Sequence, residues 1–139
     1  MKFQRDMAEA GTHVVRGYGP GQVTINEAVY RCSIVVTRER VITDSWAAIF
    51  DDLTAKQVEG LTALEPEVVI LGTGKRLRFP AAHLMRPLVD AQIGFEVMDT
   101  GAACRTYNVL VSEGRRVVAA LLMIETPPPP HSLPQGEGE

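Results

Sequence analysis

The second half of the sequence alternates between apolar, strand-like stretches and segments with helical spacing, and this order constrains the fold more than any other feature. Parallel strands need a crossover of a dozen or more residues, usually a helix, and such crossovers are right-handed. The order therefore predicts an α/β fold with parallel neighbouring strands. The expected elements are helix 54–64, strand 67–71, helix 81–89, strand 95–98, helix 102–112 and strand 115–124.

Capping residues and prolines mark where these helices begin and end. Thr54 and Gln57 have the spacing of a capping box, in which each side chain bonds the backbone of the other residue. Pro66 stops the helix that follows them. Pro80 suits the first position of the next helix. Pro87 lies inside that helix and predicts a kink or an early break.

The first third of the chain is typical of short β-strands joined by turns. Its expected strands are 12–18, 22–25, 29–37 and 41–43. The stretch 29–37 alternates at first and is then apolar on both faces, which predicts one strand that begins at a wet edge and ends inside. These strands are expected to be antiparallel.

The ends of the chain differ in composition from the part between them. Residues 1–11 are expected to form a flexible N-terminal arm and residues 12–125 a single α/β domain. Residues 126–139 include the run Pro127–Pro130 and little that could be buried. This composition predicts a disordered Pro-rich tail.

Composition excludes several classes of function. The net charge of −3 gives no general attraction to nucleic acid. No apolar run reaches the ~20 residues of a membrane-spanning helix, so no direct membrane insertion is expected. Cys32 and Cys104 lie far apart, which favours free thiols in a reducing compartment over a disulfide. We expect a cytoplasmic protein.

The glycine-rich loop after strand 67–71 invites comparison with phosphate-binding loops. In Gly72-Thr-Gly-Lys-Arg-Leu77, Leu77 stands where the dinucleotide-binding fingerprint has its third glycine. The G-x-x-x-x-G-K-[ST] pattern is also missing, and Pro80 delays the next helix. Two glycines that let the backbone turn sharply explain this loop. No nucleotide or other cofactor is therefore expected.

The stretch 94–108 combines a strand, a tight turn and the start of a helix. Asp99 or Thr100 is expected to cap a helix that begins near Ala102, so that free N–H groups face one point. If strands 67–71 and 95–98 are parallel neighbours, their carboxyl ends meet at one edge, where open α/β sheets bind ligands. The candidates for ligand or partner binding are Gly72, Thr73, Gly74, Asp99, Thr100, Gly101, Cys104, Arg105 and Asn108.

Cys104 could be a reactive thiol, because a helix start and the neighbouring Arg105 both lower the pKa of a cysteine. No histidine is supplied as a base: His13, His83 and His131 are expected on a strand, a helix and the tail. A small buried cysteine is the commoner outcome, and we assign no catalytic residue. The sequence has no C-x-x-C, H-x-x-x-H or H-E-x-x-H pattern, so no metal site is expected.

Two longer motifs resemble a known family. The first is Val68-Val-Ile-Leu-Gly-Thr-Gly74, and the second is Gly94-Phe-Glu-Val-Met-Asp-Thr-Gly-Ala-Ala-Cys-Arg-Thr-Tyr-Asn108. Over residues 12–124 the chain resembles a family of domains of unknown function in bacteria and archaea, which includes the third assembly factor of the alpha subcomplex of mitochondrial respiratory complex I. The resemblance implies a three-layer α/β fold, with a mixed central sheet flanked by helices and a small antiparallel N-terminal sheet.

Two functional hypotheses remain. The resemblance implies no established enzymatic activity or cofactor, and its mitochondrial member binds other proteins during the assembly of a membrane complex. It therefore favours a non-enzymatic protein-binding domain that acts as an assembly or accessory factor, with another protein as the partner. The alternative is a small-molecule or anion-binding protein, or an enzyme, that uses the crevice at Gly72–Gly74 and Asp99–Arg105. No oligomeric state follows from the sequence.

Overall fold

The strand β9 (Val117–Leu122) lies at the centre of the fold, and all of its residues are buried. The structure is a computed structural model that describes residues 11–125, so the predicted tail and all of the predicted arm except Gly11 lie outside the described residues. Alternate residues of β9 pack into two different hydrophobic cores, one on each face of the sheet. A strand covered on both faces is expected to be apolar throughout, as this one is.

The main sheet has five strands in the order β6-β5-β9-β7-β8. Strand β7 (Val68–Thr73) pairs in parallel with β9 on one side and with β8 (Gly94–Met98) on the other. Strand β5 (Ile34–Val36) is antiparallel both to β9 and to β6 (Val41–Ile42). The predicted mixed sheet, with parallel neighbours in the second half of the chain, is confirmed.

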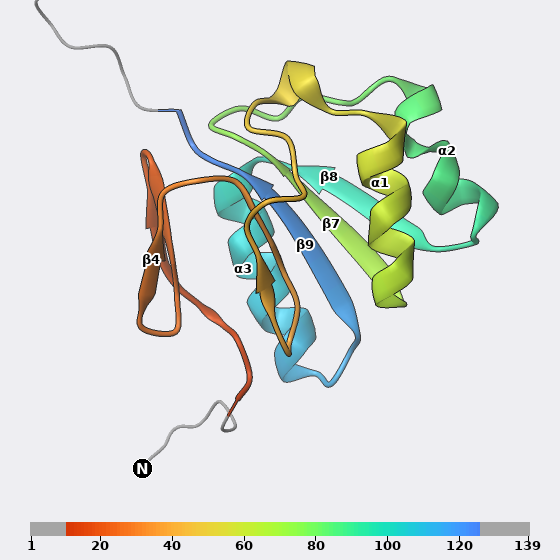
Figure 1. The fold of residues 1–139 in the computed structure, drawn as a ribbon. Coiled ribbons are helices and arrows are strands. Elements are labelled where there is room, and N and C mark those ends of the chain that lie inside the picture. The colour runs from red at the N-terminus through yellow and green to blue at the C-terminus, as the bar shows by residue number, and fades with distance from the viewer. Residues whose placement is uncertain (1–10, 126–139) are drawn as a thin grey trace, which may run out of the picture.

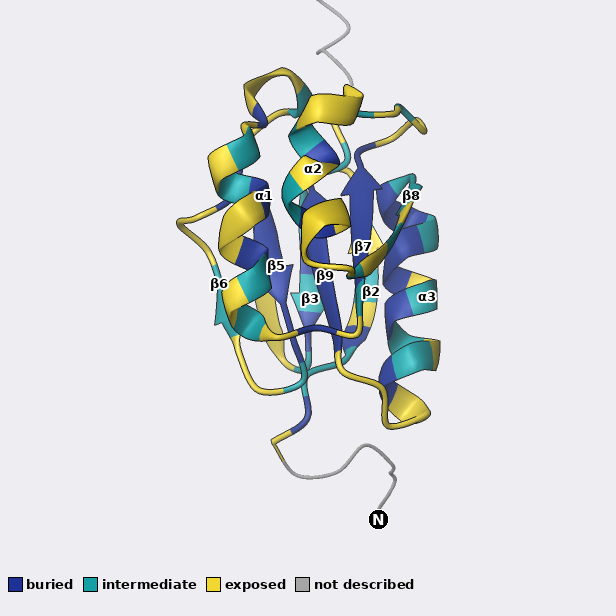
Figure 2. Cartoon of the chain, turned by 90° about the vertical axis from the view of Figure 1, so that its right-hand side faces the viewer, coloured by how far each residue is buried: buried dark blue, intermediate teal, exposed yellow. Residues whose placement is uncertain are grey.

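Two layers cover the faces of this sheet (Figure 1). The helices α1 (Ala55–Leu61) and α2 (Ala82–Asp90) pack on one face, and their buried residues share a core with the even-numbered residues of β9. The helix α3 (Thr100–Ser112) covers the other face, and its core contains the odd-numbered residues of β9. Figure 2 shows the buried strands between these layers. The predicted three-layer α/β fold is therefore confirmed.

A small antiparallel sheet lies beside α3 and completes the layer on that face. It contains β2 (Val15–Gly19), β3 (Gln22–Ile25) and β4 (Ala28–Tyr30) in sequence order. Val15, Val23 and Ile25 belong to the same core as α3. The predicted N-terminal antiparallel sheet is confirmed.

The prediction of one strand over residues 29–37 is wrong. The chain leaves the small sheet after Tyr30 and enters the main sheet at Ile34. Arg31 and Cys32 are exposed in between, and Ser33 Oγ donates a hydrogen bond to Ala48 O at 3.2 Å. Residues 31–33 therefore form a crossing between two sheets, which alternation of side chains alone does not reveal.

The capping residues predicted the helix ends more accurately than the prolines did. Thr54 Oγ1 accepts from Gln57 N at 3.2 Å and Gln57 Oε1 accepts from Thr54 N at 3.1 Å, which confirms the capping box. The 3₁₀ turn η2 (Thr62–Leu64) extends α1 to the predicted end. However, α2 begins at Ala82 rather than at Pro80, and it continues past Pro87 to Asp90. Between β6 and α1, the only regular element in the described chain is the 3₁₀ turn η1 (Phe50–Asp52).

We expect Gly60→Ala to stabilise the fold. Gly60 lies inside α1, and a Cβ added there meets nothing within 4 Å. Alanine restricts the unfolded backbone and favours the helix, so the free energy of unfolding should rise by roughly 0.5–1 kcal/mol. Urea unfolding followed by circular dichroism measures this change. A decrease would mean that α1 does not run through Gly60 as described.

Candidate functional site

The carboxyl ends of β7, β8 and β9 meet at one end of the main sheet, where α3 also begins (Figure 1). The register pairs Gly72 of β7 with Met98 and with Leu121. The structure thus brings the segments 72–74 and 99–105 to one place, as the predicted parallel pairing requires. Asn108 lies further along α3. Whether these residues bind a ligand or a partner stays a prediction.

Thr100 is the centre of this end of the sheet. Its hydroxyl donates to Leu122 O at 2.6 Å and accepts from Gly74 N at 2.8 Å, while its backbone N donates to Gly74 O at 2.9 Å. The side chain is almost fully buried, with 1% of the residue exposed. One hydroxyl therefore joins the ends of β7 and β9 to the first turn of α3.

Asp99 is the residue that caps α3. Its Oδ1 accepts from Ala102 N at 2.8 Å, and the helix begins at Thr100, before the predicted start at Ala102. A carboxylate at this position satisfies an orphan N–H group and complements the helix dipole. The alternative of Thr100 as the cap is wrong, because the Thr100 hydroxyl is used by the neighbouring strands.

Gly72 and Thr73 shape the loop that leaves β7. A Cβ at Gly72 would lie 2.9 Å from Thr100 Oγ1 and 3.1 Å from Ala103 Cβ, so glycine is needed for close packing of α3 on the sheet. Thr73 Oγ1 donates to Arg76 O at 2.7 Å and accepts from Arg78 N at 3.2 Å. These bonds fold the loop back on the strand end.

Lys75 binds a carboxylate of the same chain, and Gly74 leaves room for it. Gly74 has a φ of +96°, and a Cβ there would lie 3.0 Å from both carboxylate oxygens of Glu125. Glu125 Oε1 accepts from Lys75 N at 2.8 Å. The backbone donors of a turned, glycine-rich loop attract anions, and in this loop Glu125 supplies the anion. Sequence patterns around the loop gave no sign of this distant partner.

Tyr18 of the small sheet covers the first turn of α3. A Cβ at Gly101 would lie 2.9 Å from Tyr18 Cε1, so Gly101 makes room for the ring. Arg105 donates to the Tyr18 hydroxyl, and its guanidinium lies 5.9 Å from the ring centroid. Two of the predicted binding candidates therefore contact a side chain that the sequence analysis did not select.

Cys104 and Asn108 face inward from α3. Burial raises the pKa of the Cys104 thiol to about 12, although nearby Arg105 acts to lower it. The lowered pKa expected for a helix start is therefore wrong, because the loss of solvent outweighs the nearby cation. Asn108 accepts from Val15 N at 2.9 Å and donates to Val15 O at 2.8 Å, which fastens β2 to the helix. Both cysteines are free, as predicted.

Three backbone hydrogen-bond donors at this end of the sheet are already engaged within the protein. The backbone N–H groups of Gly74, Lys75 and Ala102 bond to Thr100, Glu125 and Asp99 respectively. A cavity beside Thr73 and Glu125 has a volume of about 120 Å³. Ligand sites usually measure roughly 300–1,000 Å³. Within the described residues, the Glu125 carboxylate occupies part of the predicted crevice, and ligand binding there stays a prediction.

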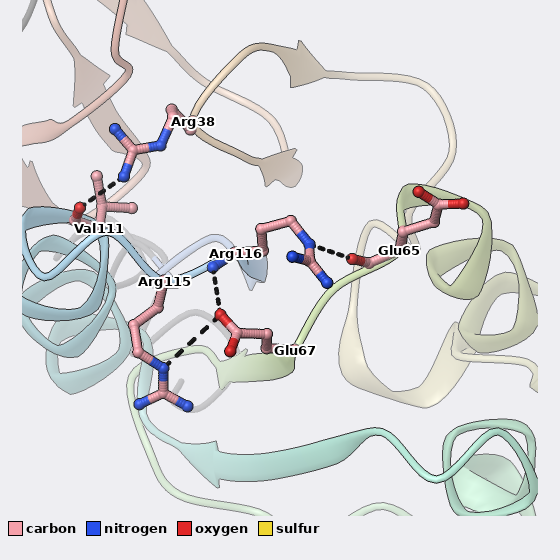
Figure 3. Close-up of polar contacts among 6 residues, drawn as sticks. All are labelled: Arg38, Glu65, Glu67, Val111, Arg115 and Arg116. Atoms are coloured by element: carbon pink, nitrogen blue, oxygen red, sulfur yellow. Dashed lines mark hydrogen bonds and ion pairs between the residues drawn. The ribbon is translucent and has the colours of Figure 1, made fainter.

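A second polar cluster lies at the opposite end of the sheet, where β7 and β9 begin (Figure 3). Glu67 accepts from Arg116 N at 2.8 Å and lies 3.8 Å from Arg115 Nε. Arg116 Nε donates to Glu65 O at 3.0 Å. The cluster therefore ties the connection after α1 to the start of β9.

Arg38 extends this cluster to α3. Its Nη2 donates to Val111 O at 2.8 Å, in the last turn of the helix, where a cation complements the dipole. A cavity of about 340 Å³ lies between this arginine, Arg40 and Arg116. Sequence analysis did not select these residues. The charged runs at 38–40 and 113–116 were the available signal.

Residues 11–125 show neither a metal-binding cluster nor a membrane-spanning helix. No group of three or more His, Cys, Asp or Glu side chains in this range could hold a metal ion. No helix in the same range has the length and apolar composition that crossing a membrane requires.

The fold places this chain among domains of a known type. A solved structure from Bordetella pertussis, described as a Mth938-like domain, is 33% identical and has a TM-score of 0.74. The similarity covers 90% of this chain and 94% of that one. A solved protein from Bordetella parapertussis is 36% identical, with a TM-score of 0.77 over 84% of this chain and 99% of that chain. The chain thus has a Mth938-like fold.

The sequence comparison then identifies the family. Residues 15–122 match the family described as protein of unknown function (DUF498/DUF598), and the chain belongs to it. NADH dehydrogenase (ubiquinone) 1 alpha subcomplex assembly factor 3 of Danio rerio is 34% identical over 125 residues, which are 88% of this chain and 68% of that protein. The predicted family resemblance is confirmed.

We expect Thr100→Val to destabilise the protein. Valine keeps the shape of threonine but leaves the buried N–H of Gly74 and the C=O of Leu122 without the hydroxyl that bonds them. Each buried unpaired group costs about 1–3 kcal/mol, so the loss should be about 2 kcal/mol or more. Urea unfolding measures it. Thr100→Ser retains the hydroxyl and should lose clearly less, and equal losses would contradict the assigned role.

We also expect stability to fall above pH 9 through Cys104. Burial raises the pKa of this thiol from 9.0 to about 12. The unfolded chain therefore releases the proton first, and stability present below pH 9 is lost as the pH rises towards 12. Between pH 8 and pH 10 the wild type should lose roughly 1 kcal/mol more than Cys104→Ala. Urea midpoints at the two pH values test this, and equal pH dependence in the two proteins would contradict it.

Proposed function

We propose that this chain is a non-enzymatic protein-binding domain that acts as an assembly or accessory factor. The observation that carries the proposal is a set of exposed apolar side chains at one end of the molecule. Ile49, Leu77 and Phe79 are 55%, 50% and 72% exposed, and we call them the Phe79 surface. Exposed aromatic anchors are typical of protein interfaces.

Contacts beneath the Phe79 surface hold its two segments together. The Arg78 guanidinium lies 4.1 Å from the centroid of the Phe50 ring, and its Nη2 lies 3.1 Å from Asp51 Oδ1. The bonds from Thr73 Oγ1 to the backbone of Arg76 and Arg78 fix the same loop from behind. Figure 1 shows η1 and the loop after β7 at the same end of the molecule. A surface ordered in advance loses less entropy on binding.

Charged residues surround the apolar centre. Lys75 and Arg76 are exposed on one segment, and Asp51 and Asp52 are exposed on the other. An apolar centre with a mixed polar rim fits a protein partner. Because these charges offset one another and the chain has a net charge of −3, the surface offers little attraction to nucleic acid.

The relatives support this proposal. The Danio rerio protein is by name an assembly factor of NADH dehydrogenase, and we extend the accessory role, though not that partner, to this chain. We also propose a cytoplasmic location and a partner that is another protein.

The alternative of an anion or small-molecule site at 72–74 and 99–105 has one observation in its favour. The loop at Lys75 does bind a carboxylate, that of Glu125, and Glu125 is exposed. An external anion would have to displace this side chain. The protein-binding proposal needs no such rearrangement, and we prefer it for that reason.

We expect Phe79→Ser combined with Leu77→Ser to abolish partner binding without loss of stability, because both side chains are exposed. Val109→Ser is the matched control, since Val109 is 54% exposed but lies on α3. The measurement is affinity capture from a lysate of the native organism with quantitative mass spectrometry. Partners retained by wild type and Val109→Ser should drop at least tenfold for the double variant. Equal retention by all three proteins would contradict the proposal.

A further inference from the structure

A cavity of about 510 Å³ lies between α1 and the β5–β6 hairpin. Its apolar lining consists of Val35 and Ile42 of the hairpin, Leu61 and Leu64 near the end of α1, and Trp46. Figure 2 looks onto α1 and β6, which flank it. The volume is within the range of roughly 300–1,000 Å³ that is usual for small-molecule sites.

Trp46 lines this cavity and carries an unused hydrogen-bond donor. The residue is only 8% exposed, and its Nε1 has no acceptor among the described residues. Tryptophan has a single donor and no acceptor, and a buried donor without a partner destabilises the fold. A molecule that supplied an acceptor would recover part of this lost stability.

The other polar groups around the cavity are engaged or exposed. The capping box uses Thr54 Oγ1 and Gln57 Oε1. Lys56 and Asp44 are exposed and of opposite charge, so they select neither a cation nor an anion. The indole N–H is therefore the polar group of this lining that lacks a partner among the described residues, and the remaining walls are mainly apolar.

We propose that this cavity binds a small, mainly apolar molecule that carries a carbonyl or carboxylate oxygen, and that this oxygen accepts a hydrogen bond from Trp46 Nε1. Because Nε1 is covered, the oxygen reaches it after a small shift of residues 44–47. This segment lies between β6 and η1, outside any helix or strand. The site is separate from the Phe79 surface, so either proposal can fail without the other.

The single tryptophan of the chain makes the test direct, because a ¹⁵N-labelled sample has one indole N–H signal in its NMR spectrum. The full chain is titrated with octanoate and with 2-octanone, which separate the carboxylate from the carbonyl as the acceptor. Octyltrimethylammonium is the matched probe, since it has the same chain and no acceptor oxygen. We expect a saturable downfield shift of the indole proton with at least one of the two oxygen-bearing probes and none with the ammonium probe.

Two variants test separately the contributions of the hydrogen bond and of the cavity to binding. Trp46→Phe keeps an aromatic ring and removes the donor, and it should weaken binding about tenfold, the value of one net hydrogen bond. Gly60→Leu places a larger side chain at the cavity lining, where a Cβ meets nothing within 4 Å. It should weaken binding at least tenfold, whereas Gly60→Ala should bind nearly as well as the wild type. Backbone amide shifts measure these affinities.

Several outcomes would overturn the proposal. One is the lack of a saturable shift with either oxygen-bearing probe. Others are equal binding of the ammonium probe, or unchanged affinity in Gly60→Leu. If Trp46→Phe does not fold, the Gly60 pair and the ammonium probe still decide the result. An indole signal that stays fixed while the surrounding amides shift would overturn the assigned role of Trp46.

Discussion

The hydroxyl of Thr100 is the interaction on which the arrangement of the main sheet and α3 depends. It is buried, it donates to the end of β9 and it accepts from the loop after β7. The strands β7 and β9 are parallel neighbours, and their ends meet the start of α3, which follows β8 in the chain. A hydroxyl can donate and accept at once, so a single small side chain joins them. The tight contact between Thr100 and Gly72 follows from the same joint.

This joint changes the interpretation of the motif that contains it. A strand that runs into a helix through a tight turn can present free N–H groups to a ligand. Here Asp99 accepts from Ala102 N at the helix start, and Tyr18 covers Gly101, the glycine after the turn. In the neighbouring loop after β7, Thr100 and Glu125 accept from Gly74 N and Lys75 N. The motif of residues 94–108 is therefore explained by packing and capping.

Local sequence patterns predicted much of this structure, whereas contacts between residues far apart in the sequence were missed. The capping box was predicted because Thr54 and Gln57 are close together in the sequence. The parallel strands in the second half were predicted from the alternating order of strands and helices. The crossing at 31–33 depends on there being two separate sheets, and no local signal marks it. Likewise, Tyr18 meets Gly101 and Glu125 meets Lys75 only after folding. The high pKa of Cys104 follows from burial, which overrides the helix-start argument.

The segment between β6 and α1 contributes residues to both proposed binding sites, the cavity beside α1 and the Phe79 surface. Trp46 lines the cavity beside α1, and Phe50 supports Arg78 beneath the Phe79 surface. Most of the main sheet is buried and most of its strands are paired on both sides, so it offers few free groups to a ligand or partner. Segments with few backbone partners open more easily and are the usual carriers of function. Trp46, Leu53 and Phe50 of this segment pack in one core, so its place in the fold is set by side-chain packing rather than by strand pairing.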